Sequence, residues 1–334
     1  MIFIVGNSRS GTTLLGRMLN QHSKIHTLEE LHFFEQMVDA NATVKREVWT
    51  KKKSLNAIQR LLTSARANVF ASVQSGEYNE ECEAILKNAP KADIISVYEE
   101  TLAYLTTEAG KRMPCEQTPR YLYVSDEILA TMPEAIMISM VRDPRAVLAS
   151  QKNKWKRYGI ARDRMPLFWA IRAWINYHPV TMSLMWASAS RQARRLKHHP
   201  RSIVIKYEDL LTNTEHELHR ICKLAGVSFE RAMKEVALIG SSTASDKPDE
   251  FGVDTSRIYA WQDGSLSAAE LSICERVLQT ELEYWGYKKI STPLPAHQHI
   301  SFFLSFIFKS SAALLLNFGR FKSLAETIRR RVLS

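Results

Sequence analysis

One stretch near the amino terminus constrains the fold of this chain more than any other, and it reads Gly6-Asn7-Ser8-Arg9-Ser10-Gly11-Thr12-Thr13. It follows four β-forming residues, 2–5, and precedes apolar residues at helical spacing over 14–19. A strand, a tight glycine-containing loop and a helix together direct backbone N–H groups and a helix N-terminus at an anion. The pattern predicts a phosphate-binding loop. The alternative is a strand–turn–helix crossover in which glycine serves geometry alone.

The loop differs from that of the nucleotide triphosphatases in one respect. Its G-x-x-x-x-G spacing fits, but those enzymes have Lys and then Ser or Thr after the second glycine. Here Thr12 and Thr13 occupy those positions, and no lysine occurs between Met1 and Lys24. Arg9 carries the cation of the loop instead, so we expect a guanidinium rather than an ammonium beside the reacting group.

Length and composition bound the class of protein. With 334 residues, 45% hydrophobic and 24% charged, the chain is typical of a globular protein that buries a sizeable core. The net charge of +10 suits an anionic cofactor, an anionic polymer or an acidic membrane surface. The four cysteines are far apart without zinc-binding spacing, and residues 2–5 already form a strand rather than a signal peptide. We therefore expect a cytoplasmic protein with reduced thiols and no metal site.

Apolar β-forming runs recur along the chain between helical patterns. After the first strand they occupy 25–28, 113–115, 135–141 and 202–207, and the run 135–141 is typical of a strand buried on both faces. Much of 35–110, one long segment at 167–196 and a capped segment at 267–285 are predicted to be helical. We expect an α/β fold, a P-loop-type parallel β-sheet flanked by helices over residues 1–290, with a C-terminal helical extension over 291–334.

Two adjacent carboxylates follow the predicted strand 25–28. Ligands of open α/β sheets bind at the carboxyl ends of the strands, so this position lies near the phosphate-binding loop. Glu29 and Glu30 point in different directions, and at most one of them faces the site. Glu30 is our candidate general base. The alternative is an acidic helix start that complements the helix dipole.

A second candidate anion site follows the buried strand 135–141. Arg142 stands at the end of that strand, Asp143 is a good N-cap, and Pro144 is a good first helical residue. Ser150 lies two turns into the following helix. An arginine and a hydroxyl placed in this way hold a second phosphate. The alternative is that Arg142 pairs with Asp143 or another carboxylate for structural reasons.

The segment 167–196 is rich in tryptophan and arginine, which raises the question of nucleic-acid binding. Its tryptophans are typical of a core, and its basic end, followed by 198–200 (His-His-Pro), is typical of a helix C-terminus. We therefore expect no nucleic-acid partner. Further along, Trp261 either stacks on an adenine or belongs to the core.

The C-terminal segment is apolar and then basic. Residues 302–308 and 312–316 are apolar, Lys309 interrupts them, and Arg320, Lys322 and 329–331 (three arginines) follow. A central lysine costs about 2.5–3.5 kcal/mol in a membrane span, whereas an interfacial helix keeps its basic residues at the lipid headgroups. Residues 300–331 therefore pack on the domain or on a second copy, lie on a membrane surface, or span a membrane.

Three of these motifs together resemble the PAPS-dependent sulfotransferases, where PAPS is 3′-phosphoadenosine 5′-phosphosulfate. Residues 9–13 resemble the 5′-phosphosulfate loop of that family, residues 142–150 its 3′-phosphate motif, and 207–211 the segment that closes on the cofactor. The likeness runs in order from the first strand to about Tyr287. It is greatest to the tyrosylprotein, carbohydrate and bacterial members, which share Arg-Ser-Gly-Thr-Thr and a later glutamate, here Glu30.

The resemblance implies transfer of a sulfuryl group from PAPS to a hydroxyl of a saccharide, a lipid or glycolipid, or a tyrosyl acceptor. Glu30 then removes the acceptor proton, and Arg9 with the loop N–H groups stabilises the leaving phosphate. The expected cofactor contacts are Arg9, Ser10, Gly11, Thr12, Thr13, Arg142, Ser150, Tyr207, Ser256, Arg257 and Trp261. The resemblance requires no metal, and the product is 3′-phosphoadenosine 5′-phosphate (PAP).

One position departs from the family pattern. Members often carry Glu-Lys-Thr-Pro, whereas this chain has Gln117 within Glu-Gln-Thr-Pro, and a glutamine donates a hydrogen bond without a charge. Either activity is weaker or Arg257 or Arg120 supplies the charge. Two rival functions remain. One is a P-loop kinase using ATP, which lacks its lysine here, and the other is a non-catalytic, membrane-associated nucleotide-binding protein.

Overall fold

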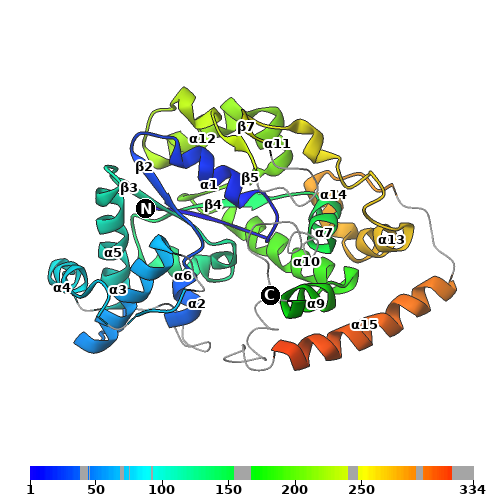
Figure 1. Ribbon diagram of the computed structural model, residues 1–334. Coiled ribbons are helices and arrows are strands. Elements are labelled where there is room, and N and C mark those ends of the chain that lie inside the picture. Colours follow the sequence, from blue (N-terminus) through cyan, green and yellow to red (C-terminus); the bar gives the residue numbers. More distant parts are fainter. Residues whose placement is uncertain are drawn as a thin grey trace.

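A computed structural model describes residues 1–37, 44, 46–67, 71–74, 76–91, 93–153, 167–239, 247–290 and 296–317 (Figure 1). Its centre is a five-stranded sheet whose strands are all parallel, in the order β2-β3-β1-β4-β5. The strands are β1 (Ile2–Gly6), β2 (Ile25–Leu28), β3 (Met113–Gln117), β4 (Ile136–Val141) and β5 (Ser202–Lys206). The predicted P-loop-type parallel sheet is confirmed.

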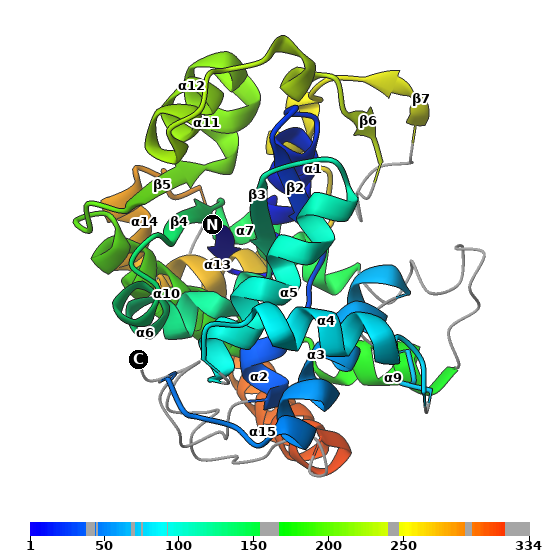
Figure 2. The same cartoon turned by 90° about the vertical axis from the view of Figure 1, so that its left-hand side faces the viewer.

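The central strand β1 is buried on both faces because its side chains alternate between two cores. Phe3 and Val5 belong to a core formed with α3 (Lys51–Arg66), α4 (Asn79–Asn88), α5 (Ile94–Glu108) and α6 (Ser125–Thr131). Ile2 and Ile4 belong to the opposite core, formed with α1 (Thr12–Asn20), α11 (Tyr207–Thr212) and α12 (Thr214–Ala225). Figure 2, turned by 90°, shows α3, α4 and α5 grouped in front of the sheet.

A third core joins the end of the sheet to the later helices. It contains residues of α7 (Pro144–Lys152), α10 (Pro179–Leu196), α13 (Ala268–Val277) and α14 (Gln279–Trp285). The smaller elements are α2 (Phe33–Met37), three 3₁₀ helices at Pro119–Val124, Arg231–Lys234 and Thr255–Ile258, and an antiparallel pair β6 (Ala237–Leu238) and β7 (Lys247–Phe251). The four cysteines are buried and free, as expected.

Two predicted helices are each divided in the structure. The prediction of one helix over 167–196 is wrong, because α9 (Leu167–Ile175) ends before α10 begins at Pro179. Pro179 has no N–H to continue a helix, and the ring of His178 caps the new one by accepting from Val180 N at 3.3 Å. The segment 267–285 also divides, into α13 and α14, although the predicted capping box of Ser267 and Glu270 is present.

The helix α15 (Ala296–Asn317) lies alongside α9 (Figure 1). Lys309 Nζ donates to Tyr177 O at 3.1 Å, and His178 Nε2 lies 3.1 Å from Ser305 Oγ. One face of the predicted extension therefore packs on the domain. The proposed boundary at 291 and the basic residues after Asn317 lie outside the described residues. No helix in the described ranges is long and apolar enough to cross a membrane.

Candidate active site

The phosphate-binding loop between β1 and α1 has a backbone that its sequence makes possible. Arg9 and Gly11 lie in the left-handed region, at φ 74° and 91°, and Gly11 is the N-cap of α1 without a capping side chain. A Cβ on Gly11 would lie 2.3 Å from the ring of Tyr207, so only glycine permits this approach. The ring of Tyr207 therefore packs against the loop. The N-cap residue has no side chain to cap the N–H groups at the start of α1.

The parallel sheet brings the predicted site residues to one edge. Glu30 follows β2, Gln117 ends β3, the loop follows β1, Arg142 follows β4, and Tyr207 follows β5. Because the strand order is β2-β3-β1-β4-β5, the loop stands between two flanks. We call the side of β2 and β3 the acceptor flank and the side of β4 and β5 the nucleotide flank.

On the nucleotide flank, Arg142 is nine-tenths buried and ties three segments together. Its guanidinium donates to the carbonyl of Arg9 at 3.2 Å and to that of Arg257 at 3.0 Å, and it lies 4.2 Å from the ring centroid of Tyr207. Arg9 Nε in turn donates to Ser150 Oγ at 2.8 Å. Arg142 and Ser150, predicted to share one phosphate, are therefore linked through Arg9.

Two buried polar atoms of this flank have no hydrogen-bond partner among the described residues: Ser10 Oγ and Arg142 Nε. A buried donor left unpaired costs about 1–3 kcal/mol. Both atoms belong to segments that the motifs assign to phosphates, and both would be satisfied by phosphate oxygens. The residues present therefore fit a nucleotide with two phosphate positions.

The neighbouring Asp143 and Arg145 have a structural role. The Arg145 guanidinium pairs at 2.7 Å with both Asp143 and Glu275, and it lies 4.3 Å from the ring centroid of Trp261. Trp261 is only 4% exposed and belongs to the third core. The sequence allowed Trp261 either to stack on an adenine or to belong to the core, and in the structure it belongs to the core. Asp143 pairs with Arg145 rather than with Arg142.

Ser256 and Arg257 lie on the 3₁₀ helix beside Arg142. Asp254 holds both of them, accepting from Ser256 N at 3.0 Å and from Arg257 Nε at 3.2 Å. The backbone carbonyl of Arg257 is the one that Arg142 contacts. These residues border the nucleotide flank, and Arg257 already has a carboxylate partner.

On the acceptor flank, Glu30 forms a pair that sequence reasoning missed. His32 Nε2 lies 3.0 Å from Glu30 Oε2, and His32 Nδ1 lies 3.5 Å from Glu35 Oε1. Burial alone lowers the pKa of His32, but the neighbouring carboxylates of Glu30 and Glu35 stabilise the protonated ring and raise the pKa to about 9. Burial by itself raises the pKa of Glu30. The contact with His32 and the charge of Arg120 outweigh burial, so the pKa of Glu30 is lowered. His32 sits at φ 52°, a strained conformation typical of functional sites.

Gln117 stands between the loop and Glu30. It is buried, its Nε2 donates to Thr12 Oγ1 at 3.2 Å, and its side-chain amide contributes to lowering the pKa of Glu30. Arg120, one of the two candidates for the missing charge, pairs with Glu35 at 3.1 Å. Gln117 thus connects the acceptor flank to the loop.

A buried carboxyl anchors the short segment that carries Glu30. Glu116 accepts from Leu31 N at 3.3 Å, from Thr118 Oγ1 at 2.6 Å and from the Tyr98 hydroxyl. Burial raises its pKa to about 7 in spite of these donors. The position of Glu30 therefore depends on β3 and α5 as well as on β2. A pair of titratable residues two apart, Glu30 and His32, was the sequence signal that could have identified this cluster.

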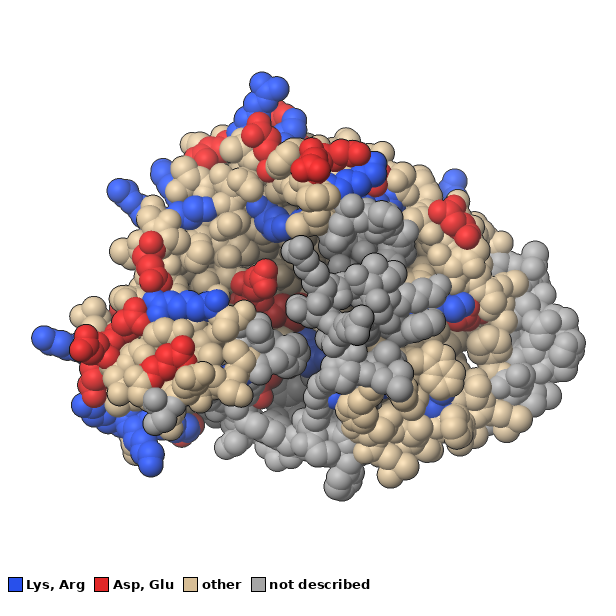
Figure 3. Space-filling view, viewed as in Figure 1, with Lys and Arg blue, Asp and Glu red and all other residues tan. Residues whose placement is uncertain are grey.

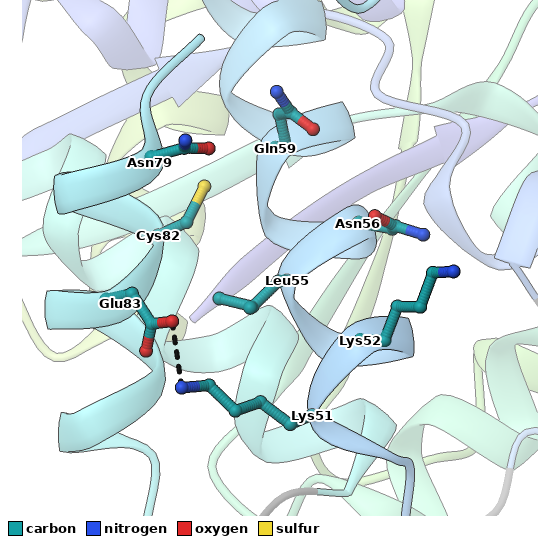
Figure 4. A pocket seen from close by; sticks show the side chains of 8 residues that line it. All are labelled: Lys51, Lys52, Leu55, Asn56, Gln59, Asn79, Cys82 and Glu83. Carbon is teal, nitrogen blue, oxygen red and sulfur yellow. Dashed lines mark ion pairs between the residues drawn. The ribbon is translucent and has the colours of Figure 1, made fainter. Parts of the chain in front are cut away.

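A separate hollow of about 550 Å³ lies between α3 and α4 (Figure 4). Lys51 and Glu83 form an ion pair at 2.8 Å across its lining. Leu55 from α3 and Cys82 from α4 both extend into the space between the two helices. None of the residues predicted for the site lines this hollow. Among the described residues no cluster of three or more His, Cys, Asp and Glu side chains is placed to hold a metal ion.

Comparison with known proteins bears on the family. A model of the "Sulfotransferase family" matches residues 2–231. Nodulation protein NoeE of Sinorhizobium fredii is 27% identical over 238 residues, which are 69% of this chain and 50% of NoeE. Protein-tyrosine sulfotransferase 2 of Gallus gallus is 24% identical over 72% of this chain and 55% of its own. The chain spans about half the length of these curated relatives.

The fold has a counterpart among solved structures. The sulfotransferase domain from the curacin biosynthetic pathway superposes with a TM-score of 0.50 at 19% identity. The alignment covers 87% of this chain and 98% of that domain. Together these findings confirm the resemblance that the motifs indicated.

Proposed function

The chain belongs to the sulfotransferase family, and we propose that it transfers a sulfuryl group from PAPS to a hydroxyl of an acceptor. The observation that carries the proposal is the order of groups along the sheet edge. An anion-binding loop, with unpartnered Ser10 Oγ and Arg142 Nε on its nucleotide flank, is followed on its other flank by Glu30. PAPS, when bound, supplies the activated sulfuryl group.

The nucleotide flank binds and orients the phosphates. The N–H groups at the start of α1, with the hydroxyls of Ser10 and Thr13, donate to the 5′-phosphate. Arg142, already held over Tyr207, turns its unpartnered Nε toward the 3′-phosphate. Thr12, whose hydroxyl accepts from Gln117, acts mainly through its backbone N–H. The loop thus binds the 5′-phosphate, and Arg142 after β4 binds the 3′-phosphate.

The acceptor flank moves the proton. Glu30 accepts the proton of the acceptor hydroxyl as the new O–S bond forms and the bond between sulfur and the phosphate oxygen breaks. The lowered pKa keeps Glu30 ionised at neutral pH, and His32 fixes one of its oxygens. His32 is thus the residue that we assign to positioning Glu30.

The loop carries the groups that stabilise the charge developing on the leaving phosphate. Arg9 and the N–H groups of α1 stabilise it, which is the largest electrostatic contribution such a site makes. Gln117 adds a neutral donor where the family pattern has a lysine. Since Arg120 and Arg257 each have a carboxylate partner, Arg9 is the cation that we assign to the leaving group.

The acceptor is a hydroxyl compound, and a saccharide, a lipid or glycolipid and a tyrosyl side chain are the classes we would screen. The name of the avian relative favours including a tyrosyl peptide. The exposed side chain of Glu30, at 44%, leaves room for a bulky acceptor to reach it.

Thermal stability tests the nucleotide assignment. We would compare the unfolding midpoint with PAP, with ADP, and with ATP and magnesium. A ligand at one hundred times its Kd stabilises the folded state by about 2.7 kcal/mol. A shift with PAP in the absence of metal is expected. A shift with ATP and magnesium alone would contradict the proposal and favour a kinase.

Turnover separates an enzyme from a binding protein. After a PAP shift is found, release of PAP from PAPS is measured over the acceptor panel. Acceptor-dependent release is expected for at least one class. PAP binding without release for any acceptor would favour the non-catalytic alternative.

A further inference from the structure

The surface formed by α9 and α15 is unusually apolar. Eight of the fifteen large hydrophobic side chains that are exposed in the described part of the chain lie on these two helices. They are Phe168, Ile171, Trp174, Leu304, Ile307, Phe308, Leu314 and Leu315. We call this set the α9–α15 face. Figure 3 shows a mostly tan area in the region where Figure 1 places α15, whereas red and blue groups gather on the left and along the top of the view.

The α9–α15 face is a consequence of helix periodicity. Leu304, Ile307, Phe308 and Leu315 recur at spacings of three, four and seven, so they share one side of α15. Their exposed fractions are 61%, 50%, 67% and 79%. The other side of α15 packs inward, where the ring of Phe306 lies 5.2 Å from that of His178. The helix therefore has one face against the protein and one apolar face without cover in the described structure.

The charged side chains of α9 and α15 are basic, and the sequence on either side of the two helices is predominantly basic. Neither helix contains an Asp or Glu, and their Arg and Lys residues are Arg172 and Lys309. In the sequence, 154–166 before α9 carry five Lys and Arg against one acid, and 318–334 after α15 also carry five against one. An apolar face with cationic neighbours complements an anionic bilayer, whereas a second copy of the same face would bring like charges together.

We propose that the α9–α15 face binds the surface of an anionic lipid bilayer. The apolar side chains enter the boundary between headgroups and acyl chains, while basic residues meet the phosphates. Lys309 Nζ lies 4.2 Å from the ring centroid of Trp174, and an amphipathic ring beside a cation suits the membrane–water interface. This inference goes beyond the proposed sulfuryl transfer and does not depend on it.

Vesicle flotation of the full chain tests the proposal. The probes are vesicles of phosphatidylcholine alone and of phosphatidylcholine with phosphatidylglycerol in equal parts. The chain is expected to float with the anionic vesicles, less so at high salt and least with the neutral ones. In the double variant Leu304→Ser/Phe308→Ser, partitioning should fall at least about tenfold, since two large apolar side chains no longer enter the bilayer.

A matched control removes two equally exposed side chains elsewhere. Phe251→Ser/Ile290→Ser, at 67% and 55% exposure, should float like the unmodified chain. Both variants should keep the unfolding midpoint and the shift with PAP. Absence of flotation, or flotation that the first variant does not reduce, would overturn the proposal. So would a concentration-dependent dimer that only the first variant abolishes, because the face would then bind a second copy.

Discussion

The two flanks of the phosphate-binding loop are built in opposite ways. On the nucleotide flank, Arg142 is 9% exposed and locked by two backbone carbonyls and the ring of Tyr207. On the acceptor flank, the Glu30 side chain is 44% exposed and pairs with His32. On one flank the arginine is buried between packed elements, and on the other the glutamate stands on a short segment that the buried Glu116 anchors.

The difference agrees with the ligands that the proposed function assigns to each flank. A constant nucleotide is best bound by groups held in place before it arrives, since ordering costs are then already met. An acceptor needs one correctly placed base and otherwise open space. If this comparison holds, substitutions on the two flanks should separate into effects on nucleotide affinity and effects on turnover.

Glu30→Gln should have the largest effect. Loss of the general base is expected to lower kcat by about 10²–10⁴-fold, because Glu30 is the carboxylate that we assign to take the acceptor proton. The Kd for PAP should be unchanged, since Glu30 lies beyond the opposite side of the loop. Steady-state kinetics and calorimetric titration measure the two quantities. Normal turnover would remove Glu30 from its role.

Arg142→Ala should reverse that pattern. Loss of charge-assisted hydrogen bonds of about 1.5–3 kcal/mol is expected to weaken PAP binding roughly 10- to 100-fold. Binding of adenosine 5′-phosphosulfate, which lacks the 3′-phosphate, should change much less. Arg231→Ala, an exposed arginine on a 3₁₀ helix, serves as the control and should bind PAP normally. An equal loss for both nucleotides would mean that Arg142 supports the loop rather than the 3′-phosphate.

Gly11→Ala probes the contact that closes the nucleotide flank. The added methyl meets the Tyr207 ring in a left-handed backbone, which should cost about 1–3 kcal/mol and lower the unfolding midpoint. PAP should then give a smaller shift. Gly264→Ala is a useful comparison, because its φ of 77° is also left-handed but nothing lies within 4 Å of the added atom. Equal effects at both glycines would show that strain alone, and not Tyr207, matters.

His32→Gln should have the smallest effect and the most specific signature. Because the folded pKa is raised from 6.5 to about 9, the stability that His32 contributes is complete below pH 6.5 and is lost as pH rises through about 9. In the unmodified chain both stability and kcat should decline over that interval. The variant should show a kcat lowered a few-fold, by the worth of one hydrogen bond of about 0.5–1.5 kcal/mol, and no such decline. Identical pH profiles would exclude His32 as a positioning residue for Glu30.

Local sequence signals determined the strands, the loop and the family. Five apolar runs and the glycine spacing of 6–11 are properties of neighbouring residues, and parallel pairing then brings the carboxyl ends of the strands to one edge. The order of motifs was sufficient to identify the sulfotransferase family. The break at Pro179 was also visible in the sequence, because a proline cannot continue the helix before it.

The tertiary structure alone decided which side chains contact one another and which of them are buried. Arg142 reaches Arg9 and Arg257 across 133 and 115 residues of sequence, and Glu116 reaches Leu31 across 85, distances over which no periodicity carries information. Trp261 could have faced a ligand or the core, and the neighbouring ring of buried ion pairs around Arg145 put it in the core. Burial and hydrogen bonding are properties of the packed chain, because each depends on atoms that only the fold brings together.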